Sequence, residues 1–324
     1  MVKDTGLKKI VIFGGGTGLS TLVRGLKKYP VDITAVVTVA DDGGSSGRLL
    51  NEYDIPPPGD VRNVMAALSD VEPLIEKMFQ YRFPSSKSLE GHSLGNLMLA
   101  ALTNITGDFA RAVEQMSHIL KIKGKVLPAA NERITLKAEL EDGTIVIGES
   151  KIPTYGKKIN RVFLSPADVR TLPETIAAIE QADLIVFGPG SLYTSILPTI
   201  LVEDIRRAVL QASAKKVYLC NLTDQAGETI GYTASDHVRA LYDHAKEPFI
   251  DTILLNTTDY ISLFDEHHSE QIPMPVAHDM DALYELVPEV VQKDIATIIN
   301  GYVRHKSEKV ASWLIQYMEE NSKI

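Results

Sequence analysis

The first group of residues that could do chemistry is a glycine-rich loop near the N-terminus, Gly14 to Gly18, which follows a short apolar run. Glycines let the backbone turn and approach a ligand closely, and the first turn of the following helix offers free N–H groups to an anion. The loop is not a dinucleotide fingerprint, because position 19 is Leu, and it lacks the lysine of a P-loop. We expect it to hold a phosphate group of a nucleotide-type ligand. The alternative is a tight strand-to-helix turn without a ligand.

A second glycine-rich segment, residues 188–195, also follows an apolar run. Ser191 and Thr194 are suited to donate to a phosphate, and Tyr193 could stack on a ring. Loops at the carboxyl ends of parallel strands converge on one crevice, so Asn221 and Gln225, after the next predicted strand, are expected to line it too. The serine pattern of a hydrolase nucleophile is absent from this segment.

Two adjacent acids, Asp41 and Asp42, end the second predicted strand. Asp41 lies where a βαβ nucleotide fold places an acid on a ribose hydroxyl. The pair could instead hold Mg²⁺, which prefers carboxylate and phosphate oxygens. The third interpretation is an Asx turn that starts the following loop.

That loop, 43–59, is predicted to be long and without regular structure, which is typical of functional loops. Its start, with Gly44, Ser45 and Arg48, is either a second anion nest or a flexible surface loop.

Four further polar residues are weaker candidates. Arg62 and Asn63 lie in the first turn of a predicted helix, where they could reach a ligand, although surface placement is the default. Asn96, at another helix start, could bond a base or sugar. Arg304 could clamp a diphosphate with two parallel hydrogen bonds; the alternative is a solvated charge at a helix start.

The elements that must position these residues alternate between strands and helices. Apolar runs at 9–13, 32–39, 183–187, 216–219 and 251–255 predict strands. Helical stripes follow at 19–26, 61–68, 71–79, 94–105, 109–120, 202–212 and 307–318. The pattern predicts an α/β, Rossmann-like, doubly wound and mostly parallel sheet. An Asp-Gly hairpin signal at 142–143 predicts a small β-rich insertion at about 124–164 within one domain, 1–324.

Composition limits the function classes. The chain has 324 residues, 44% of them hydrophobic, and a net charge of −9, without the basic stripe of a nucleic-acid binder. It has no apolar run of the roughly 18 residues that a membrane span needs. The single cysteine, Cys220, fits a cytoplasmic location.

Five blocks in order resemble the YvcK branch of the CofD/YvcK family, the gluconeogenesis factors. These blocks are 13–20, 39–48, 56–63, 91–96 and 188–195. The resemblance implies a cytoplasmic regulatory protein that is needed for cell shape and wall synthesis on gluconeogenic carbon sources and that binds UDP-sugars, UDP-N-acetylglucosamine in particular. It leaves room for a homo-oligomer and for regulatory protein partners. The candidate ligand-binding residues are Gly14, Gly15, Gly16, Thr17, Gly18, Leu19, Asp41, Asp42, Gly44, Ser45, Arg48, Arg62, Asn63, Asn96, Pro189, Gly190, Ser191, Tyr193, Thr194, Ser195, Asn221, Gln225 and Arg304.

Two other functions stay open. The CofD branch is a Mg²⁺-dependent transferase that moves a phospholactate-type group from a nucleotide diphosphate onto a deazaflavin, and here Asp41 and Asp42 would hold the metal. The Rossmann-like start also suggests an NAD-dependent oxidoreductase. The missing third glycine and the lack of a clear catalytic His or Lys argue against redox chemistry, although NAD would still fit the same site.

Overall fold

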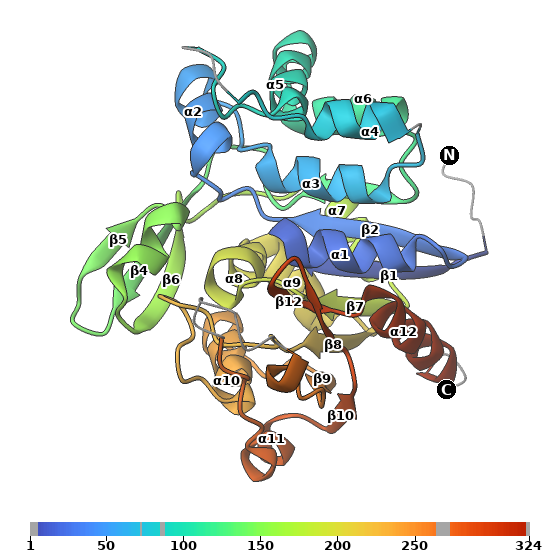
Figure 1. Cartoon of the computed structure of the whole chain (residues 1–324), viewed down its shortest axis with the longest axis vertical. Helices are drawn as coiled ribbons and strands as arrows, with labels where there is room; N and C mark the ends of the chain where they lie inside the picture. The colour runs from blue at the N-terminus through green and yellow to red at the C-terminus, as the bar shows by residue number, and fades with distance from the viewer. Residues whose placement is uncertain (1–5, 72, 85–87, 264–272, 322–324) are drawn as a thin grey trace.

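The computed structural model describes residues 6–71, 73–84, 88–263 and 273–321 (Figure 1). A seven-stranded sheet runs through the centre, and all its neighbouring strands pair in parallel. The predicted α/β, doubly wound fold is therefore confirmed. Across the sheet, the strands follow the order β10 (Glu289–Lys293), β9 (Thr252–Asn256), β8 (Lys215–Leu219), β7 (Leu184–Phe187), β1 (Lys8–Gly14), β2 (Val31–Val37) and β3 (Lys125–Pro128).

The central strands are apolar along their length because helices cover both faces of the sheet. In β1, the side chains from Ile10 to Phe13 are buried, and the ring of Phe13 stacks on that of Phe187 in β7 with centroids 5.1 Å apart. These contacts fix the register in which Phe13 lies opposite Phe187. The two strands therefore end side by side, and each delivers a glycine loop to the same edge.

Helices pack around this sheet, with α1 lying against both α3 and α12 (Figure 1). A group of helices above the sheet in this view, α3 to α6, follows β2. The helices are α1 (Gly16–Leu26), α2 (Gly44–Tyr53), α3 (Gly59–Leu68), α4 (Pro73–Gln80), α5 (Leu94–Thr106), α6 (Phe109–Ile119), α7 (Pro173–Glu180), α8 (Leu197–Ile200), α9 (Glu203–Gln211), α10 (Ala234–Ala245), α11 (Met280–Leu286) and α12 (Ser307–Asn321). Short turns of 3₁₀ or π helix are η1 (Glu149–Tyr155), η2 (Leu192–Ile196) and η3 (Ile261–Leu263).

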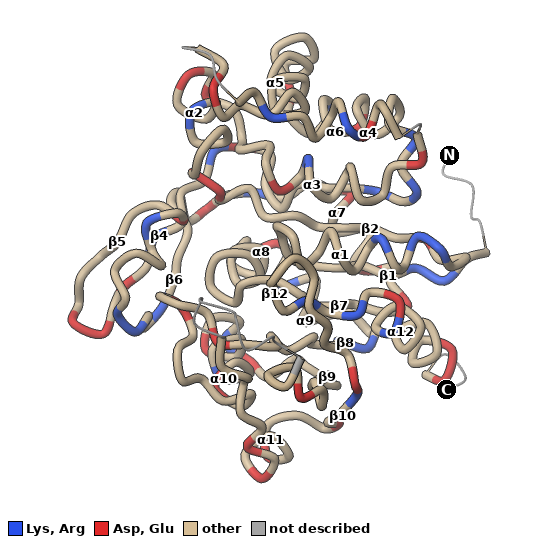
Figure 2. Tube along the Cα trace, in the orientation of Figure 1, with Lys and Arg blue, Asp and Glu red and all other residues tan. Residues whose placement is uncertain are grey.

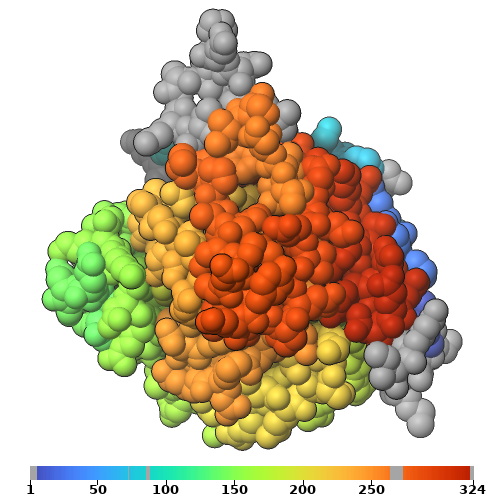
Figure 3. All heavy atoms as spheres, turned by 90° about the horizontal axis from the view of Figure 1, so that it is seen from below, coloured from blue at the N-terminus to red at the C-terminus, as the bar shows by residue number. Residues whose placement is uncertain are grey.

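The predicted β-rich insertion is a separate three-stranded antiparallel sheet of β5 (Ile145–Ile147), β4 (Thr135–Leu140) and β6 (Ile159–Ser165). Seen from below, it protrudes from one side of the molecule (Figure 3). Its expected start at about 124 is wrong, because β3 pairs with β2 at the edge of the main sheet. The small sheet itself begins at Thr135.

The predicted long loop at 43–59 is also wrong in its first half. Residues Gly44–Tyr53 form α2, with Leu49 and Leu50 buried. Helix propensity is low over two glycines and two serines, so the packing of these leucines decides the conformation. The Gly43–Gly47 segment is thus a helix start.

A hairpin near the C-terminus carries one of the candidate residues. It consists of β11 (Ala296–Ile299) and β12 (Tyr302–His305), joined by Asn300 and Gly301, both with positive φ. Asn-Gly is the preferred pair for such a tight turn. The hairpin places Arg304 over the sheet edge.

Basic and acidic residues are interspersed along the chain (Figure 2). Many of the basic side chains form ion pairs, such as Lys28 with Glu308 and Arg24 with Glu76. Among the described residues, no helix has the length and apolar character to cross a membrane.

Candidate functional site

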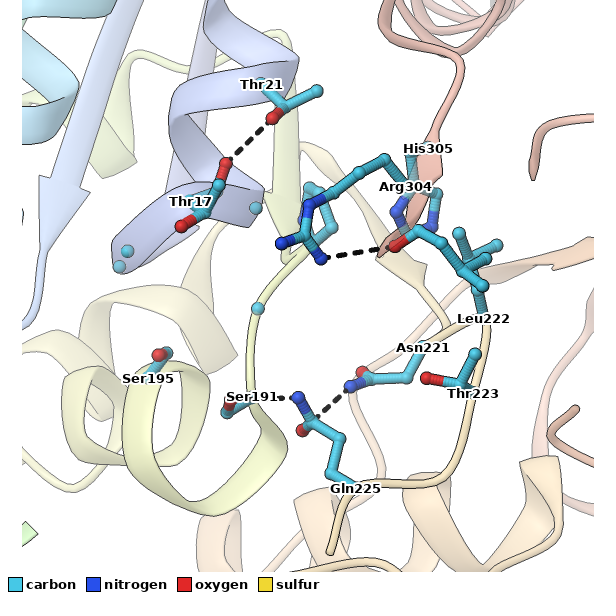
Figure 4. A pocket seen from close by; sticks show the side chains of 16 residues that line it. Thr17, Thr21, Ser191, Ser195, Asn221, Leu222, Thr223, Gln225, Arg304 and His305 are labelled. Carbon is cyan, nitrogen blue, oxygen red and sulfur yellow. Dashed lines mark hydrogen bonds between the residues drawn. The ribbon is translucent and has the colours of Figure 1, made fainter. Parts of the chain in front are cut away.

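A cavity of about 250 Å³ lies at the edge of the sheet where the strand order reverses between β1 and β7. Ligands of doubly wound sheets bind in this position, because the loops from adjacent strands diverge there. The loops after β1, β7 and β8 and the hairpin strand β12 surround the cavity (Figure 4). It is lined by Gly15, Gly16, Thr17, Gly18, Thr21, Pro189, Gly190, Ser191, Ser195, Asn221, Leu222, Thr223, Gln225, Val303, Arg304 and His305.

The two glycine loops touch each other at the cavity wall. A Cβ atom on Gly18 would lie 2.5 Å from the carbonyl oxygen of Pro189. Gly16 opens α1 with φ of +62°, a conformation that favours glycine. The loops can approach this closely only because no side chain separates them. The structure thus brings the two predicted glycine loops together and turns the start of α1 toward the cavity, with its partial positive charge.

Polar side chains from the opposite wall face these loops. Gln225 donates from Nε2 to Ser191 Oγ at 3.1 Å, and Asn221 donates from Nδ2 to Gln225 Oε1 at 3.2 Å (Figure 4). Both amides come from the segment after β8, as predicted. Ser191 and Ser195 come from the loop after β7.

Arg304 contributes a positively charged side chain to the lining of the cavity. Its guanidinium lies 5.0 Å from the centre of the Tyr302 ring and donates from Nη1 to the Val303 carbonyl oxygen at 3.2 Å. These contacts leave most of its five N–H groups for other acceptors. Figure 4 shows the side chain extending from the hairpin toward the start of α1. An anion on the glycine loop would therefore meet a planar donor fork from the other side.

Carboxyl groups gather behind the glycine loop. Asp60 lies against Gly15 and accepts a hydrogen bond from the backbone of Gly16. Burial, together with the charge of Asp41, raises the pKa of Asp60 to about 7. Burial, followed by the charges of Asp41 and Asp60, raises the pKa of Glu149 to about 8. Glu149 in the insertion is thus a largely protonated carboxyl at neutral pH.

Asp41 and Asp42, the two candidate metal ligands, accept hydrogen bonds from different parts of the chain. Asp41 Oδ1 accepts from the N–H of Gly43 at 2.9 Å, whereas Asp42 Oδ1 accepts from the N–H of Ser150 in the insertion at 2.8 Å. In the described part of the chain, no three His, Cys, Asp or Glu side chains are arranged to hold one metal ion. Asp41 and Asp42 therefore do not fit a shared Mg²⁺ site built by the protein alone.

Several candidates form a buried polar cluster instead of lining the cavity. Arg62 donates from Nε to Asn96 Oδ1 at 2.8 Å and from Nη1 to Gln80, so its expected surface placement is wrong. Asn96 donates to Ser45 Oγ at 3.1 Å, and Ser45 Oγ lies 2.9 Å from His92 Nδ1. This cluster joins α2, α3, α4 and α5. Its polar groups are satisfied by one another, as buried polar groups usually are.

The remaining candidates also lie outside the cavity lining. Tyr193 is buried, and its hydroxyl is 2.8 Å from that of Tyr232, so it is not free to stack on a ligand ring. Thr194 donates to Glu228 Oε1 at 3.0 Å. Arg48 donates to the carbonyl of Glu90. Gly14, Leu19, Gly44 and Asn63 are likewise not part of the lining, and the Leu19 side chain belongs to the core.

Other residues of the site were not predicted. Thr21, Thr223 and His305 line the cavity, and Asp60 lies against the glycine loop. The Thr21 position follows from helical periodicity, four residues after Thr17, and was open to prediction. Glu149 is brought to this edge by the insertion, which no local pattern reveals.

Comparison with known proteins matches a family model described as 2-phospho-L-lactate transferase CofD to residues 10–296. The chain belongs to the CofD family. Within it, the gluconeogenesis factor of Bacillus subtilis (strain 168) is 58% identical, over 96% of this chain and 98% of that protein. The gluconeogenesis factor of Halalkalibacterium halodurans is 53% identical, over 95% and 96%. The predicted resemblance to the gluconeogenesis factors is thus confirmed.

A solved structure agrees with the fold described above. A crystal structure of a UPF0052 family protein from Bacillus halodurans superposes with a TM-score of 0.91 at 53% identity, covering 95% of this chain and 99% of that one. Since the match to the CofD family model runs from within β1 to the first residue of β11, it includes both glycine loops and the segment after β8. It ends before Arg304, so this residue enters the site from outside the matched range.

Proposed function

We propose that this chain is a regulatory protein that binds a nucleotide sugar of the UDP-N-acetylglucosamine type in the cavity between β1 and β7. One observation supports the proposal most strongly: the glycine loop, the loop at 188–191 and Arg304 meet around one cavity. The diphosphate would lie on the backbone amides at the start of α1. Arg304 would hold it from the opposite side.

Electrostatics favour a local anion site of this kind. With a net charge of −9, the chain as a whole repels anions, so recognition must come from nearby donors. Backbone N–H groups at a helix start, the hydroxyls of Ser191 and Ser195, and the Arg304 guanidinium are such donors. The amides of Asn221 and Gln225 would meet the base or the sugar.

The relatives support the biological setting. Proteins named gluconeogenesis factor match nearly the full length of the chain. We therefore propose that the ligand reports the state of wall-precursor synthesis. The chain would act in the cytoplasm on cell shape during growth on gluconeogenic carbon sources, through partner proteins or a second copy of itself.

Isothermal titration calorimetry tests the binding. We expect UDP-N-acetylglucosamine to bind one site with a dissociation constant well below millimolar, and uridine to bind more weakly. Gly16→Val should abolish binding, because Val cannot adopt the φ of +62° without strain. Gly143→Val, at φ of +81° in the hairpin turn of the insertion, is the matched control for backbone strain. Affinities weaker than millimolar for every nucleotide sugar would contradict the proposal.

A transferase of the CofD kind is the second candidate, and Glu149 is the observation that favours it. Its carboxyl keeps its proton at neutral pH near Asp60, which itself lies against the glycine loop, and it could donate that proton to a leaving group. Asp41 and Asp60 lie close enough to raise its pKa. The aspartates alone do not supply a metal site, so any Mg²⁺ would have to be held largely by the nucleotide itself.

Turnover assays separate the candidates. A transferase would consume a nucleotide diphosphate donor in the presence of an acceptor and Mg²⁺, and Glu149→Gln would slow it by at least tenfold while sparing donor affinity. Binding without turnover across a panel of donors and acceptors favours the regulatory protein. A nicotinamide absorbance assay shows whether the protein reduces NAD.

A further inference from the structure

A chain of hydrogen bonds leads from the cavity wall into the core. Gln225 donates to Ser191, and Asn221 donates to Gln225, as described above. The Tyr218 hydroxyl lies 3.4 Å from Asn221 Oδ1 and 3.0 Å from His237 Nδ1. Tyr218 and His237 are both fully buried, in β8 and α10, and neither lines the cavity. The other three side chains line it.

The hydrogens of this chain can run in only two directions. The Tyr218 hydroxyl has one hydrogen, which goes either to Asn221 or to His237. If it goes to His237, both amides must turn round and Ser191 must donate to Gln225, so the Ser191 hydrogen is used up. If it goes to Asn221, the hydrogens all run toward the cavity. Ser191 then keeps its own hydrogen for a ligand.

The buried ring of His237 decides between these directions. Burial lowers the pKa of His237 to about 4, so the ring is neutral and carries one proton at pH 7. Its Nε2 is buried and has no hydrogen-bond partner among the residues that the structure describes. Placing the proton there would leave a buried N–H group unpaired, which proteins avoid more strictly than an unpaired acceptor. The proton therefore belongs on Nδ1, from which it is donated to the Tyr218 oxygen.

We propose that Tyr218, held by His237, is a positioning residue that turns Asn221 and Gln225 in one direction and leaves the Ser191 hydroxyl as a donor to the bound ligand. This inference rests on the proposed function. It narrows the ligand class: the part that meets Ser191 must be an acceptor, such as a phosphoryl or carbonyl oxygen. Asn221 and Gln225 each retain a second N–H for the same purpose.

The ligand-free protein gives the first test. The ¹⁵N chemical shifts of the His237 ring should show the proton on Nδ1, and the side-chain amide protons of Asn221 and Gln225 should exchange slowly with solvent. In Tyr218→Phe these amide protons should exchange faster. A proton on Nε2, or amide signals that Tyr218→Phe leaves unchanged, would overturn the proposal. Neither readout depends on nucleotide binding, so each can fail or succeed independently of the proposed function.

Ligand affinity gives the second test. We expect Tyr218→Phe to weaken binding of UDP-N-acetylglucosamine by about tenfold, the effect of one misplaced hydrogen bond. Tyr317→Phe is the matched control, because it removes another buried hydroxyl. Tyr317 lies in α12, and its hydroxyl is 2.6 Å from Thr252 Oγ1. This variant should lower the melting temperature similarly and leave affinity unchanged. His237→Asn keeps a hydrogen-bond donor at the position of Nδ1, so it should retain more affinity than His237→Leu. Equal losses of affinity in the two His237 variants would overturn the proposal. Wild-type affinity in Tyr218→Phe would overturn it as well.

Discussion

Gly18 and Pro189 form the closest link between the two glycine loops, since a Cβ atom at position 18 would lie 2.5 Å from the Pro189 carbonyl oxygen. The contact joins the loop after β1 to the loop after β7 at the switch point of the sheet. The width of the cavity therefore depends on the absence of a single side chain.

Gly18→Ala should separate these loops by several tenths of an ångström. We expect a loss of stability of about 1–3 kcal/mol from overpacking, and at least a tenfold loss of affinity for UDP-N-acetylglucosamine. Urea unfolding and calorimetry measure the two effects. Gly143→Ala, strained at φ of +81° but in open space, should lose stability without losing affinity. Wild-type binding by Gly18→Ala would show that this contact does not shape the site.

Arg304→Lys should weaken binding of the nucleotide sugar by tenfold or more and leave binding of uridine nearly unchanged. Lysine keeps the charge but loses the planar donor fork and the stacking on Tyr302, 5.0 Å away. Calorimetry with both ligands gives the comparison. Arg207→Lys, at an exposed ion pair with Glu203, serves as the control. Equal losses for uridine and the nucleotide sugar would place Arg304 away from the phosphates.

Glu149→Gln should change how stability depends on pH. The pKa of Glu149 is raised to about 8 in the folded chain, so the folded state holds a proton that the unfolded chain has released. The stability from this proton is fully present below the unfolded pKa of about 4.5 and is lost as pH rises through about 8. Its slope is at most about 1.4 kcal/mol per pH unit.

Urea unfolding at pH 5.5, 7.0 and 8.5 tests this dependence. The wild type should lose stability across the series, Glu149→Gln should lose less, and Glu141→Gln, at an exposed position of the same insertion, should follow the wild type. Parallel curves for all three proteins would mean that Glu149 is ionised in the folded chain at neutral pH.

His244 holds the insertion against α10. Its Nε2 accepts the N–H of Val162 in β6 at 3.0 Å, and its Nδ1 bonds the Ala240 carbonyl at 2.6 Å. Burial lowers the pKa of His244, so this contribution is present above the unfolded pKa of 6.5 and is lost as pH falls. His244→Ala should cost about 1–3 kcal/mol, because the Val162 N–H stays buried without a partner.

Amide hydrogen exchange detects this loss locally. We expect faster exchange over residues 159–165 in His244→Ala, and unchanged exchange in His118→Ala, whose side chain is exposed on α6. If the Val162 amide stayed as protected as in the wild type, another contact would hold the insertion.

Local patterns were sufficient for the parts of the site that are built from neighbouring residues. The glycine loops are marked by composition, and the strands before them by apolar runs, so both the fold and the meeting of the loops after β1, β7 and β8 could be predicted. The Asn300-Gly301 pair, with positive φ at both residues, is a local signal for the hairpin that positions Arg304.

Contacts between distant segments determine the burial of Arg62 and the pKa of Glu149, which local sequence patterns do not predict. Arg62 is buried because Asn96, 34 positions away, and Gln80 accept its hydrogen bonds. Glu149 has a raised pKa because the insertion places it beside Asp41 and Asp60. Neither relationship has a local signature, since both depend on segments that approach one another only in the folded chain.

A crystal structure of the chain with UDP-N-acetylglucosamine tests the central proposal most directly. We predict the diphosphate on the backbone N–H groups of Gly15, Thr17 and Gly18, with Arg304 contacting it from β12 and Ser191 donating to one of its oxygens. Electron density for the diphosphate elsewhere, such as beside Glu149 and Asp41 with the cavity between β1 and β7 left to water, would contradict it.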